Sequence, residues 1–220
     1  MRLLELTAGD DFRLLADRED YDLPPYIILS HTWSIDADEE VLFQDLKAGT
    51  GKSKPGYRKL EFCARQTRRD GLRHFWVDTC CIDKTNSVEL NTAITSMFRW
   101  YQNAVKCYVY LPDVVAFDED GEEEGWESDF RSCRWLTRGW TLQELLAPQV
   151  VEFFDHDGGK LGDKSSLERH PCAGTPRTSA VHFHDRRATI MADEADDEEG
   201  GRPSIFFDGT LRGFDGSDLR

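Results

Sequence analysis

The chain has 220 residues, of which 39% are apolar and 11% aromatic, and its net charge is −15. This length suits one domain of ordinary size with an extension, and the apolar content supports a core along part of the chain. The negative charge argues against binding to nucleic acid, because phosphates would be repelled by the average surface. No run approaches the roughly 20 apolar residues of a membrane span, and residues 1–6 are too short and too soon followed by acidic residues for a secretory signal. We therefore expect a cytoplasmic protein with no membrane span and no nucleic-acid partner.

The cysteines and glycines exclude several common kinds of site. Six cysteines are present and none forms a C-x-x-C pair, whereas zinc ligands usually lie about two to four residues apart. We therefore expect no metal, and free, mostly buried thiols in a reducing compartment. The chain also lacks both glycine-rich phosphate-binding patterns, G-x-G-x-x-G and G-x-x-x-x-G-K-[ST]. Rossmann dehydrogenase and P-loop chemistry are not expected.

Short apolar runs alternate with helical patterns along the chain. The expected strands are residues 26–30, 75–77, 105–111 and 150–154. The expected helices are residues 57–70, 86–101 and 140–146. The first of these helices is followed by Gly71 as a C-cap, and the second begins with Asn86 and Glu89 in the spacing of a capping box. Residues 117–129 are acidic and are expected to form an exposed loop.

Strands and helices in alternation predict a three-layer α/β fold, with a largely parallel sheet and helices on both faces. In such sheets a ligand site forms beyond the carboxyl ends of the strands, which here nominates residues 30–33, residues 78–83 and Asp113. From about residue 168 periodicity is lost and acidic and helix-breaking residues dominate. We therefore expect one domain at residues 1–167 and a disordered or divergent tail at residues 168–220, with residues 204–207 as an isolated strand.

Three stretches of the chain together resemble the fungal HET (heterokaryon incompatibility) domain family. They are Y-I-I-L-S-H-T-W at residues 26–33, F-W-V-D-T-C-C-I-D-K at residues 75–84 with the helix that follows, and R-W-L-T-R-G-W-T-L-Q-E-L-L-A-P at residues 134–148. The resemblance covers roughly residues 1–167. It implies a role in fungal self/non-self recognition, in which contact between incompatible strains triggers programmed cell death. It also implies self-association and partners among other incompatibility or NLR-type proteins.

The HET family is distantly similar to the TIR domains of innate immunity, some of which cleave NAD at the nicotinamide glycosidic bond. TIR enzymes carry their catalytic glutamate in the pattern W-C-x-x-E-L, and residues 140–145 read W-T-L-Q-E-L, with Thr141 in place of the cysteine. This similarity implies a TIR-like or flavodoxin-like fold and names Glu144 as the catalytic residue. NAD would be the substrate, and no cofactor would be required.

Glu144 suits this chemistry because the cleavage passes through an oxocarbenium-like state that a carboxylate stabilises. Nicotinamide leaves as a neutral amine, so a strong general acid is not needed. The structural alternative is that Glu144 pairs with Arg138 or Arg134 and fixes its helix.

Other candidates for substrate binding follow the first two expected strands. His31 would hydrogen-bond a ligand and Trp33 would stack on its ring, or else His31 locks a loop and Trp33 belongs to the core. Asp78 and Asp83 would contact ribose hydroxyls, although a turn-capping role is the favoured interpretation of Asp78.

Arg138 and Trp140 would bind a phosphate and a ring respectively, with packing as an equally good alternative. Lys84 is a further candidate phosphate contact. Cys80 or Cys81 with His31 would suggest a cysteine hydrolase, but no nucleophile signature surrounds these thiols, and buried thiols are the favoured interpretation.

Three hypotheses for function remain open on this basis. The first is a cell-death effector that self-associates and hydrolyses NAD through Glu144. The second is a non-enzymatic, self-associating signalling scaffold in which Glu144 is structural. The third is an inactive, truncated remnant.

Overall fold

A computed structural model of the chain describes residues 1–9, 11–116 and 125–169. The chain divides into two units, residues 1–167 and residues 168–220, and nearly all described residues belong to the first. The predicted tail lies outside the described residues apart from its first two positions, and so does its expected strand at residues 204–207. No helix in the described part of the chain is long and apolar enough to cross a membrane.

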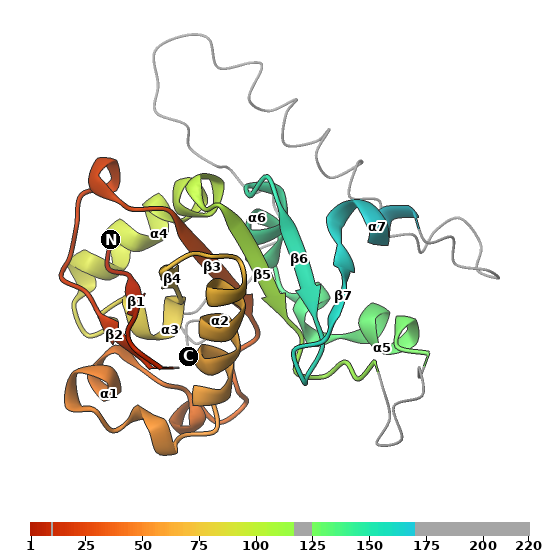
Figure 1. Cartoon of the computed structure of the whole chain (residues 1–220), viewed down its shortest axis with the longest axis horizontal. Helices are drawn as coiled ribbons and strands as arrows, with labels where there is room; N and C mark the ends of the chain where they lie inside the picture. Colours follow the sequence, from red (N-terminus) through yellow and green to blue (C-terminus); the bar gives the residue numbers. More distant parts are fainter. Residues whose placement is uncertain (10, 117–124, 170–220) are drawn as a thin grey trace, which may run out of the picture. The chain divides into compact units, whose positions relative to one another are not determined.

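The first unit is built on a seven-stranded sheet, in which the strands lie side by side as Figure 1 shows. In sheet order the strands are β2 (Phe12–Leu14), β1 (Leu4–Leu6), β4 (His74–Trp76), β3 (Tyr26–His31), β5 (Lys106–Tyr110), β6 (Val151–Phe154) and β7 (Lys160–Asp163). Strands β4, β3, β5 and β6 pair in parallel, whereas β1, β2 and β7 join antiparallel at the two edges. Numbered along the chain, the parallel strands have the order 2-1-3-4, which is the flavodoxin-like order.

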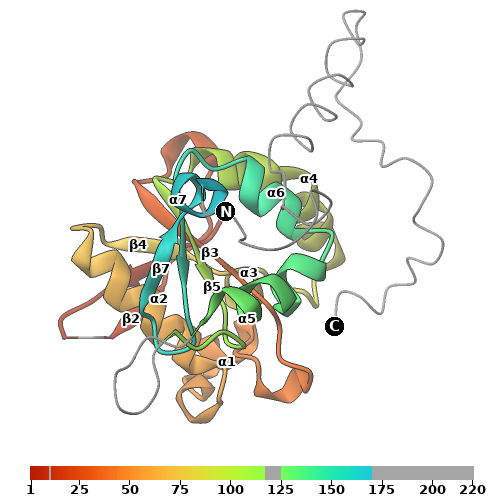
Figure 2. The ribbon, with the colours of Figure 1, turned by 90° about the vertical axis from the view of Figure 1, so that its right-hand side faces the viewer.

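Helices cover both faces of this sheet, as Figure 2 shows with α2 on one side and α4 and α6 on the other. The helices are α1 (Phe43–Ala48), α2 (Tyr57–Arg69), α3 (Asp78–Cys81), α4 (Ser87–Asn103), α5 (Glu127–Ser132), α6 (Thr141–Leu146) and α7 (Lys164–Arg169), with short 3-10 turns at Asp20–Asp22, Ala37–Glu39, Gly51–Ser53 and Arg134–Thr137. On one face the ring of Phe62 from α2 packs 5.0 Å from that of Phe154. On the other face Trp76 packs 5.7 Å from Trp100 of α4. The predicted three-layer α/β class with a largely parallel sheet is confirmed.

The predicted strands and helices all form, with small shifts at their ends. Gly71 has a φ of 73° directly after the C-cap of α2, and its N–H donates to the carbonyl of Arg68 at 3.0 Å, as predicted for a glycine that ends a helix. At the start of α4 the side chain of Asn86 accepts from the N–H of Val88 and of Glu89. The capping box is only half formed, however, because the Glu89 carboxylate binds Arg2 and the Asp83 N–H instead.

Sequence reasoning missed the antiparallel edge strands β1, β2 and β7. The predicted exposed loop at residues 117–129 is wrong at its end, since α5 begins at Glu127 and the preceding Trp126 is buried. Residues 117–124 of that loop lie outside the described residues. The free and buried thiols are confirmed for Cys63, Cys80, Cys81, Cys107 and Cys133. The sixth cysteine, Cys172, is among the residues that are not described.

Candidate functional site

The candidate site lies at the carboxyl ends of the parallel strands, near the point where the strand order reverses between β3 and β5. Strand β3 ends at His31 and leads into Trp33, while β4 leads into Asp78 at the start of α3. Helix α6 carries Glu144 to the same end of β3, where it meets Ser30. The fold thus brings together most of the residues that the sequence nominated.

Asp78 is the centre of the first half of this site. One carboxylate oxygen lies 3.0 Å from Nε2 of His31, and the other accepts from the indole N–H of Trp33 at 2.8 Å. Burial alone would raise the pKa of Asp78, but the charge of Lys84 and the bonds from His31 and Trp33 hold that pKa well below its ordinary value. Asp78 therefore joins the ends of β3 and β4, and the favoured prediction that it caps a turn is wrong.

His31 is enclosed on both sides of its ring. The side chain is buried, with Nε2 on Asp78 and Nδ1 at 3.1 Å from the ammonium of Lys59. Lys59 in turn forms a buried ion pair with Glu40. Since both ring nitrogens have protein partners, the geometry favours the alternative in which His31 holds the loop in place.

Trp33 is half-buried and carries a cation on its ring. The ammonium of Lys84 lies 3.4 Å from the ring centroid, so one face of Trp33 is covered by the protein itself. Arg138 is fixed nearby by a hydrogen bond of 3.1 Å from its Nη1 to the carbonyl of His31. Trp140 is half-buried and directly precedes α6.

Glu144 forms the second half of the site. Its Oε2 accepts a hydrogen bond from the hydroxyl of Ser30, which itself accepts from the indole N–H of Trp135 at 2.6 Å. Burial raises the pKa of Glu144 to about 7, a rise that the Ser30 hydrogen bond opposes and the charge of Asp78 increases. The guanidinium groups of Arg134 and Arg138 donate to the carbonyls of Trp33 and His31, and within the described residues neither forms an ion pair with Glu144, although the charge of Arg138 favours its ionised form.

Two acidic residues nominated by the strand-end rule lie in turns. Asp83 accepts from the N–H of Thr85 at 3.1 Å and from its hydroxyl at 2.6 Å, and it contacts Gln44. Asp113 accepts from the backbone N–H of Arg134 at 2.7 Å. The Asp83 carboxylate therefore stabilises its own turn, whereas that of Asp113 joins its turn to the 3-10 turn at Arg134–Thr137. Within the described residues neither is hydrogen-bonded to a group of Asp78 or Glu144.

The adjacent cysteines do not form a nucleophilic site. Cys80 and Cys81 are buried, and burial raises the pKa of the Cys80 thiol well above its ordinary value. A reactive thiol needs the opposite shift, towards the thiolate. Within the described part of the chain, no group of three or more His, Cys, Asp or Glu side chains is placed to hold a metal ion.

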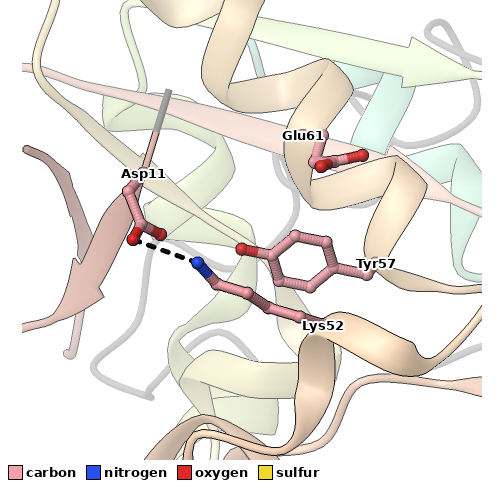
Figure 3. A pocket seen from close by; sticks show the side chains of 4 residues that line it. All are labelled: Asp11, Lys52, Tyr57 and Glu61. Atoms are coloured by element: carbon pink, nitrogen blue, oxygen red, sulfur yellow. Dashed lines mark hydrogen bonds and ion pairs between the residues drawn. The ribbon is translucent and has the colours of Figure 1, made fainter. Parts of the chain in front are cut away.

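A separate polar pocket of about 210 Å³ opens elsewhere on the domain, beside α2 (Figure 3). It is lined by Asp11, Lys52, Tyr57 and Glu61. Lys52 already pairs with Asp11 at 3.1 Å across this pocket, and both side chains are well exposed. The cation is therefore satisfied and solvated, unlike the lysine on Trp33.

Several contributors to the site carried no local signal in the sequence. Ser30 lay within the nominated strand end, but its bond to Glu144 joins residues that are 114 positions apart. Glu40, Lys59 and Trp135 were not singled out at all. Each acts through a distant partner, which residue spacing does not reveal.

The raised pKa of Glu144 predicts a pH-dependent effect of Glu144→Gln on stability. A buried carboxyl whose pKa is raised from 4.5 to about 7 is neutral at low pH and must ionise within the fold as pH rises. Its favourable contribution is present below about pH 4.5 and is lost as pH rises through about 7. Relative to wild type, Glu144→Gln should gain about 2–3 kcal/mol of unfolding free energy between pH 5 and pH 8. Urea unfolding of both proteins at the two pH values measures this, with exposed Glu61→Gln as the control; an equal difference at both pH values would contradict the assignment.

Two comparisons with known proteins point to the same family. Residues 26–120 match the family model described as Heterokaryon incompatibility protein (HET). The chain is 49% identical over 216 residues to Vegetative incompatibility protein HET-E-1 of Podospora anserina, an alignment that covers 94% of this chain. The chain spans only 16% of that relative's length. No solved structure matches the chain.

Proposed function

Since this chain carries a HET domain, we propose that it is a signalling module of fungal heterokaryon incompatibility that promotes programmed cell death by hydrolysing NAD. Other incompatibility or NLR-type proteins would be its partners, and self-association would raise its activity. The observation that carries the enzymatic part is the position of Glu144. Its carboxylate is held by Ser30 at the carboxyl end of β3, and burial raises its pKa to about 7.

In this environment the ionisation of Glu144 depends on positive charge nearby. The nicotinamide ring of NAD is cationic, and its approach would favour the ionised form of Glu144 over the neutral form. As the glycosidic bond breaks, its electron pair passes to the ring nitrogen and positive charge develops on the ribose carbon. The Glu144 carboxylate stabilises that charge. Water then adds its oxygen to the ribose carbon and loses a proton, which gives ADP-ribose and nicotinamide.

The Ser30 hydroxyl would keep the carboxylate in position during this reaction. It donates to one oxygen, Oε2, and is itself oriented by the indole of Trp135. The phenol of Tyr101 also lies close enough to this carboxylate to favour its ionised form. The oxygen that Ser30 does not hold is the one proposed to face the ribose. Arg138 and Trp140 stay candidates for substrate binding.

The test is nicotinamide release from NAD by the purified protein at high concentration. Glu144→Gln should lower the rate by about 10²–10³-fold, while Glu61→Gln, which changes an exposed glutamate of α2, should leave it unchanged. Because the carboxylate is the active form, the wild-type rate should fall as pH drops below about 7. A folded, self-associated wild type that leaves NAD intact would refute the hydrolase.

The scaffold is the second candidate, and the exposed side of α4 favours it. Four apolar side chains at helical spacing on this helix are only half-buried: Leu90, Ile94, Met97 and Phe98. A half-exposed apolar stripe suits contact with another protein domain. If NAD is untouched, Phe98→Glu should abolish self-association measured by light scattering, whereas an unchanged molar mass would argue against this surface.

A further inference from the structure

The ammonium group of Lys84 is buried without an acceptor. Its nitrogen has almost no contact with solvent and no hydrogen-bond partner in the described part of the chain. A buried ammonium loses its water shell and needs acceptors for its protons. The ring of Trp33 beneath it supplies only a cation–π contact.

The nearest carboxylate does not fill this role. Both oxygens of Asp78 already bind the side chains of His31 and Trp33. The charges of Asp78 and Lys84 stabilise each other, but no hydrogen bond joins them. The nearby Lys59 is neutralised by Glu40, which leaves Lys84 as a buried cation whose hydrogen-bond donors are unused.

A second cation lies within electrostatic range. Arg138 donates to the carbonyl of His31 and Lys84 lies over the ring of Trp33, so both cations border the segment of residues 31–33. Burial is the main cause that lowers the pKa of Lys84, and the charge of Arg138 adds to it. Only one guanidinium nitrogen of Arg138 makes a hydrogen bond among the described residues, to the carbonyl of His31. Two neighbouring cations with unused donors are stable together when an anion binds both of them.

A third unsatisfied group lies beside them in the chain. Thr32 is 2% exposed, and its hydroxyl oxygen has no hydrogen-bond partner within the described residues. It directly precedes Trp33, on whose ring Lys84 rests. Buried polar groups of native proteins are nearly always paired, so unpaired groups gathered at one strand end indicate a ligand.

We propose that Lys84 and Arg138 form a binding site for a diphosphate group at the carboxyl ends of β3 and β4. Arginine binds phosphate oxygens through paired N–H groups, and lysine adds a compact positive charge. The position is where open α/β sheets bind phosphate-bearing ligands. The site deepens the function proposed above, since it would hold the diphosphate of the same ligand, but it requires no cleavage and is tested by binding alone.

The test is calorimetric binding of pyrophosphate and of ADP-ribose at constant ionic strength. Wild type should bind at least one of the two, and Lys84→Met should weaken that affinity by about 10–100-fold, as loss of a charged hydrogen bond does. Arg138→Gln should weaken it to a similar extent. Lys52→Met is the matched control, because Lys52 is exposed and already paired with Asp11, and it should bind as wild type does.

Each outcome decides the assignment. ADP-ribose binding at least ten times tighter than pyrophosphate identifies a nucleotide diphosphate, and equal affinities identify the diphosphate alone as the recognised group. Wild type that binds neither probe, or Lys84→Met that binds as wild type does, overturns the site. If Lys84→Met does not fold, Arg138→Gln decides by the same criterion. Binding is measured without turnover, so wild type that binds a probe but releases no nicotinamide fails as a hydrolase and keeps the diphosphate site.

Discussion

Glu40→Gln should lower the free energy of unfolding by about 3–5 kcal/mol, because it leaves the buried ammonium of Lys59 without its counter-charge. The two side chains are only 2% and 9% exposed, and they form an ion pair behind His31. The Glu40 carboxylate also accepts from the N–H of Ser34 at 2.6 Å. Glutamine keeps the shape and an acceptor oxygen, so the loss would report the missing charge.

The pH dependence of this effect has a definite sign. Burial opposes ionisation of Glu40, but the charges of His31 and Lys59 hold its pKa below the ordinary value. Its stabilising contribution is therefore present above about pH 4.5 and is lost as pH falls through the lowered pKa. Urea unfolding at pH 7 measures the full effect, and the gap between the two proteins should narrow on acidification.

A paired replacement serves as the control. Glu40→Leu combined with Lys59→Met removes both charges and fills the space with apolar groups, which is often neutral or stabilising for a buried pair. The double variant should therefore be more stable than Glu40→Gln. A single variant that loses less than about 1 kcal/mol would show that solvent screens the pair.

Phe62→Ala should cost about 3–5 kcal/mol, the range expected when a buried aromatic side chain is cut back to a methyl group. Phe62 is 1% exposed and its ring lies 5.0 Å from the rings of both Tyr110 and Phe154. These residues come from α2, β5 and β6, so the ring joins a helix to two strands. Gly158 also approaches it closely, because a Cβ at that position would lie 2.8 Å from the ring.

The matched control is Phe98→Ala, which truncates the half-exposed phenylalanine of α4. It should cost clearly less, because little apolar area is removed from contact and water can fill the gap. Both values come from the midpoint and slope of urea unfolding. Equal losses for the two variants would show that Phe62 does not anchor the core.

The parallel half of the sheet could be predicted because its strands are continuous apolar runs between helical patterns. Burial on both faces gives such runs, and residues 26–31 are buried at every position. Strands β1 and β2 have only three residues each, which is too short for any periodicity. Strand β7 reads K-L-G-D and has no buried residue, so no hydrophobic pattern in the sequence predicts its pairing with β6.

The sequence predicts the residues of the candidate site only where they directly follow the carboxyl end of a strand. The carboxyl-end rule nominated His31, Trp33 and Asp78, and their carboxylate, ring and indole groups do meet. The same rule selected Asp83, whose carboxylate folds back on Thr85 instead, because a short polar side chain readily bonds its own turn. The buried partners of these residues come from segments that only the three-dimensional fold brings together.

The antiparallel strands at both edges of the sheet also affect how this domain can assemble. A long parallel edge would offer a row of unpaired backbone groups to another chain. Here the outermost strands, β2 and β7, span only three and four residues. Such short edges template β-addition poorly, so higher-order complexes should grow through helix faces and strand-end loops rather than through one continuous sheet. Their signature would be stacked, intact domains that dissociate without unfolding, unlike the cross-β packing of amyloid.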